Sequence, residues 1–183
     1  MAYPHNALNP IHAFAPALAT LCNEVWDNGN ADFPPTTFQV AQINAGAGAD
    51  NVIPGTLEVR FNLRFSTETG DAELRTRVEK ILDAAGVDYK IKWHLSGQPF
   101  LTPADATLVK TVREAVSETT GNTPQCSTAG GTSDGRFIAP SGAEVVEIGP
   151  VNESIHKVDE CVAVEDLETL AQIYERVMKK LLG

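Results

Sequence analysis

The sequence predicts an α+β protein in which a split βαβ arrangement without its first strand is followed by a shorter α/β portion. Several segments carry apolar residues at helical spacing, and others alternate apolar with polar residues. The first five segments follow the order helix, strand, strand, helix, strand, which matches a split βαβ unit from its second element onward. The 183 residues suffice for one ordinary domain or two small ones.

The first two predicted elements are a helix and a strand. A helix over 11–26 has apolar residues at helical spacing, with Asn9 as its candidate cap and Pro10 at its first position. Pro16 lies inside this span and weakens the prediction for the first turns, because proline lacks an amide N–H. The stretch TFQVAQINA predicts a strand over 37–45.

The next three elements complete the first part of the chain. The stretch TLEVRFNLRFS, residues 56–66, alternates apolar and polar side chains, which predicts a strand with one buried and one exposed face. A helix follows over 71–86 and stops at Gly86, and DYKIKWHLS predicts a strand over 88–96. A ferredoxin-like split βαβ sandwich runs strand, helix, strand, strand, helix, strand, so this part begins one strand late.

The pattern of elements restarts near residue 100, where we place a domain boundary. The second part contains a helix over 104–119, a glycine-rich loop, a short strand over 143–148 and a helix over 164–182. The last helix is expected to bury Leu167, Leu170, Ile173, Val177 and Leu181. Its acidic first turn and basic last turn complement the helix dipole. The predicted domains are therefore 1–100 and 101–183.

Composition excludes several classes of function. The chain is 43% hydrophobic and 21% charged, as in globular proteins, and its net charge of −10 without a basic run argues against nucleic-acid binding. No apolar stretch approaches the ~20 residues of a membrane span, and no signal peptide is readable. Three cysteines without a C-x-x-C pair indicate buried or half-buried free thiols in a reducing compartment. We expect a cytoplasmic protein.

The stretch STAGGTSDGRF, residues 127–137, contains the G-x-S-x-G pattern of a serine-hydrolase nucleophile elbow around Ser133. That elbow needs a buried strand directly before the serine, and the preceding residues are too small and glycine-rich for one. Alternatively, the Gly-Gly-Thr turn at Gly131 and Thr132 exposes N–H groups and a hydroxyl that could cradle a carboxylate. A plain turn is the third interpretation.

Three further residues are candidates for a site. His156 lies in a polar stretch near the predicted surface, but one imidazole cannot hold zinc, which needs three or four ligands. Arg64 lies on the polar face of the 56–66 strand and is either a solvated side chain or a fork for a substrate carboxylate. Asn51 is most simply a turn residue.

Five stretches together resemble the succinyl-diaminopimelate desuccinylase family of the di-zinc aminoacylase and carboxypeptidase superfamily. These stretches are AYPHNALNP, NVIPGTLEVRFNLRFSTE, SGQPFLTP, STAGGTSDGRF and IGPVNESIHKVDE. The resemblance implies hydrolysis of N-succinyl-LL-2,6-diaminopimelate to succinate and LL-2,6-diaminopimelate, a step of lysine and diaminopimelate biosynthesis. It also implies two zinc ions, or cobalt in their place, and a ferredoxin-like lid domain, here 1–100, that forms a homodimer.

The resemblance also implies roles for single residues. His156 matches the C-terminal zinc ligand of the family. Arg64 matches an arginine that binds a substrate carboxylate. The substrate-loop positions correspond to Gly131, Thr132 and Asn152, and the residues that reach across from the partner subunit correspond to Tyr3 and Asn51. On this interpretation the loop binds substrate and Ser133 is not a nucleophile.

The other metal-binding motifs of the family do not occur in this sequence. Its H-x-D motif, bridging aspartate and Glu-Glu pair with the general base belong to an N-terminal half, and 101–183 resembles only the last part of the catalytic domain. We therefore expect no hydrolysis by this chain alone. A non-catalytic dimerisation module built on residues 1–100 is the alternative, and a serine hydrolase using Ser133 is a third.

Overall fold

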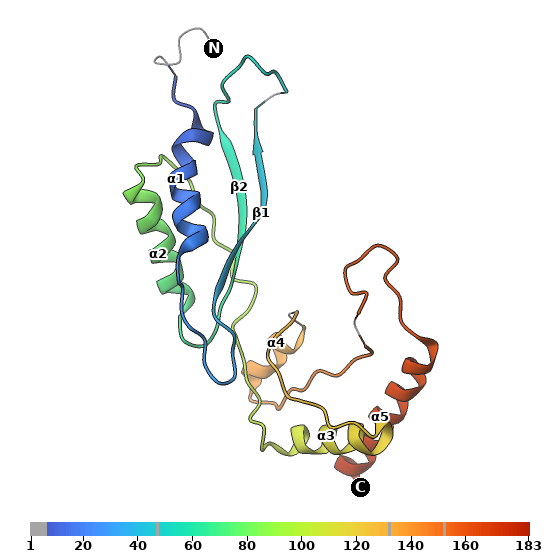
Figure 1. Ribbon diagram of the computed structural model, residues 1–183. Coiled ribbons are helices and arrows are strands. Elements are labelled where there is room, and N and C mark those ends of the chain that lie inside the picture. Colours follow the sequence, from blue (N-terminus) through green and yellow to red (C-terminus); the bar gives the residue numbers. More distant parts are fainter. Residues whose placement is uncertain (1–6, 47, 132, 152) are drawn as a thin grey trace. The chain divides into compact units, whose positions relative to one another are not determined.

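The computed structural model describes residues 7–46, 48–131, 133–151 and 153–183 (Figure 1). The chain divides into two compact units, Met1–Ser96 and Gly97–Gly183. Both helices and strands are present, so the α+β class is confirmed. The predicted boundary near residue 100 lies close to this division, and the roles assigned to the two parts stay predictions.

The first unit consists of a β-hairpin with two helices on one face. Its elements in chain order are α1 (Pro10–Asn23), β1 (Thr37–Ala45), β2 (Leu57–Arg64) and α2 (Asp71–Ala84). The two helices and the hairpin share one core, whose buried members are Ala17, Leu21, Trp26, Phe38, Leu74, Val78 and Leu82. Figure 1 shows α1 and α2 next to each other along the hairpin.

The start of α1 follows the prediction closely. The Asn9 side chain accepts a hydrogen bond from the Ile11 N–H at 3.0 Å, and Pro10 is the first helical residue. The helix continues through Pro16. It ends at Asn23, three residues before the predicted end, because the chain turns there into a polar cluster around Asp27.

The two strands form an antiparallel ladder that runs from the pair Thr37 with Arg64 to the pair Ala45 with Leu57, with a bulge between Val40 and Gln42. Along β2, half-buried apolar residues alternate with exposed polar ones, as the sequence predicts. The apolar face of the hairpin packs on the helices, and its polar face stays open.

The strand predicted over 88–96 is wrong for the described residues, since no strand is formed there. The alternation that predicted it is real: Tyr89, Ile91 and Trp93 pack against the core, and the residues between them are exposed. A strand also needs a hydrogen-bonded neighbour, and the only ladder described is β1 with β2. Side-chain periodicity therefore survives without the ladder.

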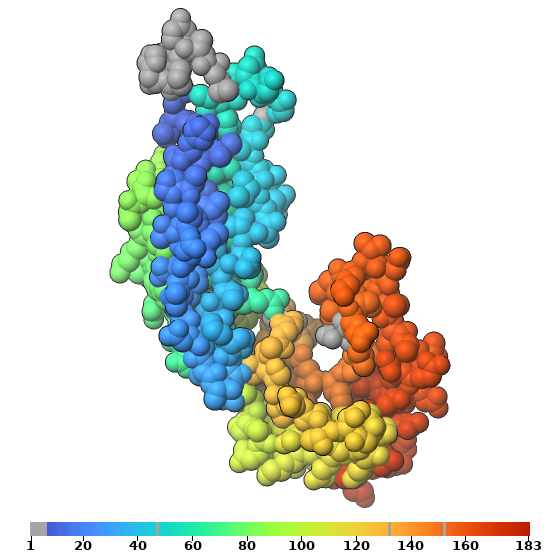
Figure 2. Space-filling view, viewed as in Figure 1, coloured from blue at the N-terminus to red at the C-terminus, as the bar shows by residue number. Residues whose placement is uncertain are grey.

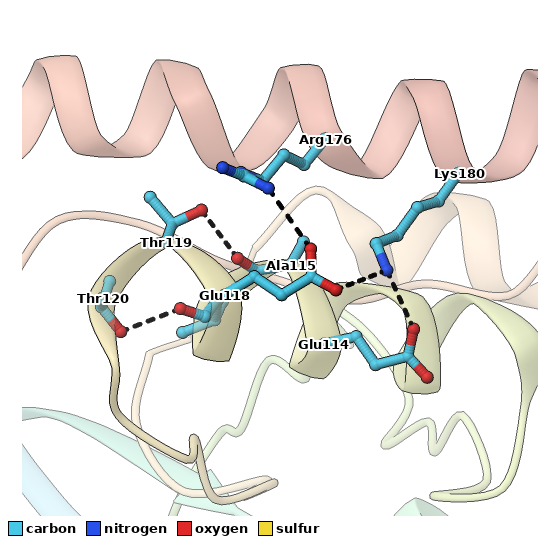
Figure 3. A network of polar contacts seen from close by, with 8 residues as sticks. Glu114, Ala115, Glu118, Thr119, Thr120, Arg176 and Lys180 are labelled. Carbon is cyan, nitrogen blue, oxygen red and sulfur yellow. Dashed lines mark hydrogen bonds and ion pairs between the residues drawn. The ribbon is translucent and has the colours of Figure 1, made fainter.

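The second unit is organised around two helices, α3 (Thr107–Thr120) and α5 (Val164–Leu182), with the short α4 (Gly135–Ile138) and the 3-10 turn η2 (Ala139–Ser141) between them. Buried side chains from α3 and α5 meet in a small core of Val112, Ala115, Ile173 and Val177. At the rim of this core, Lys180 donates to Glu118 at 2.8 Å and to Glu114 at 3.2 Å (Figure 3). The bond from Lys180 lowers the pKa of Glu118.

Two predictions about this unit are wrong. No strand is formed over 143–148 in the described part of the chain, because no neighbouring strand is available to pair with it. The predicted burial of Leu167 and Leu181 also fails, since they are 51% and 40% exposed. The apolar stripe of α5 is wider than the surface that α3 covers.

The three cysteines, Cys22, Cys126 and Cys161, are free as expected, but all are exposed instead of buried. Across the described residues, no helix combines the length and apolar character needed to cross a membrane.

Candidate functional site

His156 lies at the tip of a loop that is closed by local hydrogen bonds. The Ser154 hydroxyl donates to the Cys161 carbonyl at 2.7 Å and accepts from the Cys161 N–H at 2.9 Å. The Lys157 N–H donates to the Ser154 carbonyl at 3.0 Å. These bonds hold His156 in the left-handed region, with φ of 60°, where histidine is more common than most residues. Figure 2 shows this loop in orange on the surface of the second unit.

The surroundings of His156 contain one carboxylate that contacts its backbone. The His156 N–H donates to Glu160 Oε2 at 3.3 Å, and the histidine side chain is exposed. In the described part of the chain, no group of three or more His, Cys, Asp or Glu residues could hold a metal ion. His156 can therefore supply one imidazole ligand, and the described residues do not complete a zinc site, which needs at least three protein ligands.

The glycine-rich loop around Gly131 leads into α4 and is shaped by its own hydroxyls. The Ser127 hydroxyl accepts from the Ala129 N–H at 3.0 Å, and Gly130 has a φ of 115°, which only glycine adopts readily. Gly131 is exposed, and a Cβ placed on it would contact nothing within 4 Å. The backbone at Gly131 is thus accessible to a ligand.

Ser133 does not have the setting of a nucleophile. Its hydroxyl donates to the Glu147 carboxylate and accepts from the Gly135 N–H at 2.9 Å, so it bridges a carboxylate and the start of α4. The described residues before it form no strand, and the elbow of a serine hydrolase requires one. The geometry therefore assigns Ser133 to the structure of the loop.

Gly135 and Arg136 fix this loop to the rest of the second unit, and the sequence analysis predicted neither contact. A Cβ on Gly135 would lie 2.8 Å from Val145 Cγ1 and 3.2 Å from Phe100 Cζ. The Arg136 side chain packs 2.7 Å from the position that a Cβ on Gly97 would occupy. A Cβ at Gly135 would collide with Val145, and Gly97 lies against the Arg136 side chain, so the glycines at these two positions were the signal in the sequence.

The two candidates in the first unit lie at opposite ends of the hairpin. Arg64 is the last residue of β2, is exposed, and pairs with Thr37 in the ladder. Asn51 lies in the exposed turn that joins the other ends of β1 and β2. At about 3.3 Å per residue, β2 spans roughly 23 Å, so one small ligand cannot contact Arg64 and Asn51 of the same chain.

The sequence profile of Peptidase family M20/M25/M40 matches residues 13–180, which is nearly all of the chain and includes both units. The chain belongs to this family. The matched span includes Arg64, Asn51, Gly131 and His156.

Curated relatives of this M20 chain carry a more specific name. It is 59% identical over 182 residues to the succinyl-diaminopimelate desuccinylase of Thioalkalivibrio sulfidiphilus, and 60% identical over 183 residues to that of Methylococcus capsulatus. The resemblance predicted from the motifs is confirmed. Each alignment covers 100% of this chain and 48% of the relative, so the chain spans about half the length of the curated relatives it matches.

Solved structures show that the M20 fold extends through both units. Aminopeptidase PepT from Bacillus cereus matches 99% of this chain and 48% of its own, with a TM-score of 0.73 and 19% identity. An M20 family metallo-carboxypeptidase from Sulfolobus solfataricus matches 97% of this chain and 54% of its own, with a TM-score of 0.79 and 16% identity. At these identities the likeness concerns the fold alone.

The predicted site residues of this M20 chain fall into three groups. Arg64 and Asn51 belong to the first unit, and Gly131 and His156 to the second. Tyr3, Thr132 and Asn152 lie outside the described residues. Within the first unit, Arg64 and Asn51 lie at opposite ends of the hairpin, and the roles of all these residues stay predictions.

Asp27, which the sequence did not mark as special, has a carboxyl with a depressed pKa. Burial alone would raise its pKa, but hydrogen bonds from the hydroxyl and N–H of Thr36, the N–H of Gly29 and the hydroxyl of Ser66 outweigh burial and lower it to about 2. This carboxylate joins the turn after α1 to the residue before β1 and to a residue just after β2. These lie at the end of the ladder where Thr37 pairs with Arg64. Its role is structural.

Proposed function

We propose that this chain forms one half of a succinyl-diaminopimelate desuccinylase, which converts N-succinyl-LL-2,6-diaminopimelate and water to succinate and LL-2,6-diaminopimelate. The observation that carries the proposal is the 59–60% identity along the whole chain to proteins of that name. Membership of the M20 family supports the reaction class, a metal-dependent amide hydrolysis. The activity then belongs to lysine and diaminopimelate biosynthesis.

His156 is the proposed metal ligand of this chain. Its exposed position at the tip of a locally closed loop supports the role, because an imidazole held this way is available to a site formed with other polypeptide. The metal would be zinc, or cobalt in its place, and it would polarise the amide carbonyl. Since the described residues supply too few ligands, we assign the remaining ones to the part of the longer relatives that this chain does not match.

Substrate binding is assigned to both units. We assign Arg64 to a substrate carboxylate, because a planar guanidinium can bind it with two parallel hydrogen bonds. The accessible backbone at Gly131 would donate to another polar group of the substrate, together with Thr132 and Asn152.

Asn51 and Tyr3 are assigned to the active site of a partner subunit in a homodimer. The distance between Asn51 and Arg64 supports this, since the length of β2 keeps both from one small ligand unless they come from different copies. The first unit would serve as the ferredoxin-like lid through which the dimer forms. Its order α1, β1, β2, α2 agrees with that fold from the second element onward.

A chimera tests the proposal. The chain replaces the matching half of the Methylococcus capsulatus relative, and release of succinate from N-succinyl-LL-2,6-diaminopimelate is measured. We expect the chimera to hydrolyse the substrate and the chain alone to be inactive. A folded but inactive chimera would contradict the proposed function, and turnover by the purified chain would contradict its dependence on a second half.

Two histidine variants of the chimera test the ligand assignment. His156→Ala should lower the rate by at least about 100-fold and reduce bound metal, because a catalytic metal contributes several kcal/mol. His94→Ala, which changes another exposed histidine, should leave the rate and the bound metal unchanged. Equal rates for the two variants would refute the role of His156.

The alternative function is a dimerisation module without catalysis. The open polar face and unpaired outer edge of the two-stranded sheet favour it, because such edges pair with other strands. Light scattering of the chain alone tests this alternative. A monomeric chain would contradict the dimerisation module. A dimeric, inactive chain, together with an inactive chimera, would support it.

A further inference from the structure

The loop that carries His156 has almost no buried surface to hold its shape. Over residues 153–163 every residue is exposed except Ser154, which is half-buried. Its apolar members are no exception, since Ile155 is 46% and Val158 is 93% exposed. A loop without apolar packing must take its conformation from hydrogen bonds, so the bonds of this loop decide how His156 is held.

The backbone of this loop has an uncommon conformation at two positions. His156 and Asp159 have φ of 60° and 61°, and in the described part of the chain they are the only residues other than glycine with a positive φ. The left-handed region is sterically unfavourable for a residue with a Cβ. Two such residues in one short loop therefore need surrounding bonds that fix them.

Ser154 supplies the bonds that join the two ends of the loop. Its hydroxyl donates to the Cys161 carbonyl at 2.7 Å and accepts from the Cys161 N–H at 2.9 Å. One side chain thus satisfies both backbone polar groups of a residue seven positions later, much as a neighbouring strand would. The two bonds close the backbone into a ring, and both left-handed residues lie inside it.

The other bonds of the loop are shorter in range. The Lys157 N–H donates to the Ser154 carbonyl at 3.0 Å. The His156 N–H donates to Glu160 Oε2 at 3.3 Å, and Lys157 Nζ donates to the Glu153 carbonyl at 2.6 Å. Each of these bonds spans three or four residues, so none joins the ends of the loop. Among the described residues, only the Ser154 side chain does.

The imidazole of His156 takes no part in this bonding. The bonds of the loop use backbone groups and the side chains of Ser154, Lys157 and Glu160, and none from the described residues reaches the histidine ring. His156 is also exposed. Its backbone is therefore fixed while its ring nitrogens stay open to other groups, which suits a histidine that ligates a metal through one of them.

We propose that Ser154 is a positioning residue for the metal ligand His156. Its hydroxyl joins the ends of the loop, and this closure keeps the His156 backbone in the left-handed conformation, so that the imidazole is presented to a metal ion in one orientation. The inference rests on the proposed function, in which His156 is the metal ligand of this chain. Ser154 itself acts only through the backbone of the loop.

NMR relaxation of the backbone amides of the intact chain tests the closure of the loop. In the wild type, His156 and Val158 should have order parameters of about 0.8, as in rigid backbone. Ser154→Ala should lower both values below about 0.6, because no other described contact joins the ends of the loop. The amides of α3 and α5 should keep their values, which would show that the variant is folded and the effect is local.

Two further serine variants serve as matched controls. Ser154→Thr keeps a hydroxyl at the same position, so the loop should stay rigid. Ser141→Ala removes a hydroxyl that donates to the Ile138 carbonyl at 2.7 Å in the same unit, and it should leave the His156 loop unchanged. The comparison separates the hydroxyl of Ser154 from the general loss of a surface serine.

Cobalt binding by the chimera tests the effect on the metal ligand. The metal-free chimera is titrated with Co²⁺ alone and binding is followed by calorimetry, so the measurement requires no turnover. Ser154→Ala should weaken binding by about 10- to 100-fold, the usual loss when a group that orients a metal ligand is removed. Ser154→Thr and Ser141→Ala should bind Co²⁺ as the unmodified chimera does.

Three results would overturn the proposal: a loop that stays rigid in Ser154→Ala, a loosened loop with unchanged cobalt binding, or a Ser154→Thr variant that fails as Ser154→Ala does. His156→Ala separates this inference from the proposed function. If His156→Ala weakens cobalt binding and Ser154→Ala does not, only the positioning role is wrong. If His156→Ala leaves cobalt binding unchanged, the ligand assignment itself is wrong, and the positioning role is wrong with it.

Discussion

Replacing Asp27 by asparagine should destabilise the first unit at neutral pH. One carboxylate oxygen, Oδ1, accepts from the N–H groups of Gly29 and Thr36 at 2.8 and 2.9 Å. The other, Oδ2, accepts from the hydroxyls of Thr36, Ser66 and Thr69. Asparagine keeps the first acceptor but presents an NH₂ group to the three hydroxyls, and it removes the charge that strengthens all five bonds.

The pKa of Asp27 gives the magnitude of the effect. Its fall from 3.8 to about 2 corresponds to an upper limit of about 2.5 kcal/mol, at about 1.36 kcal/mol per pKa unit. Because the side chain is only partly buried, solvent screening reduces this contribution to about 1–2 kcal/mol. Asp27→Asn should lower the free energy of unfolding by that amount at pH 7.

The same effect should depend on pH in a defined direction. Since the folded-state pKa is depressed, the stabilisation is complete above the unfolded value of 3.8 and disappears as pH falls toward 2. At pH 3 about half of it should remain. Urea unfolding of the wild type and the variant between pH 7 and pH 3 measures the difference, with Asp88→Asn on the exposed surface as the control. An Asp27→Asn chain as stable as wild type at pH 7, or a difference that does not change with pH, would refute the reasoning.

Two further substitutions test other contacts by the same urea unfolding. Arg77→Met removes hydrogen bonds to two backbone carbonyls and a carboxylate in the turn after α1, so it should cost about 1–3 kcal/mol, whereas Arg60→Met, whose ion pair is exposed, should cost little. Gly135→Ala places a Cβ 2.8 Å from a valine methyl and should cost about 1–3 kcal/mol, whereas Gly149→Ala, with open space around it, should be nearly neutral. Equal effects within either pair would contradict the contact on which it depends.

The exposed apolar residues of α5, among them Leu167 and Met178, offer a surface that a longer protein could cover.

Local features of the fold followed from the sequence because they depend on neighbouring residues. The cap at Asn9, the stop of α2 before Gly86 with its φ of 66°, and the alternating faces of β2 each need only a few adjacent positions. The candidate site could be predicted less fully from the sequence. The motifs identified His156 and Arg64 as candidates, but contacts such as that of Ser133 with Glu147 depend on the folded chain.

What the sequence by itself determined is the α+β class, the four long helices, the two strands of the hairpin and the relation to desuccinylases. Only the tertiary structure decided that residues 88–96 and 143–148 form no strands, and that the turn after α1 is organised by Asp27. The physical reason is the range of the interactions involved. A helix satisfies its backbone within its own sequence, whereas a strand and a shared carboxylate need partners from distant parts of the chain.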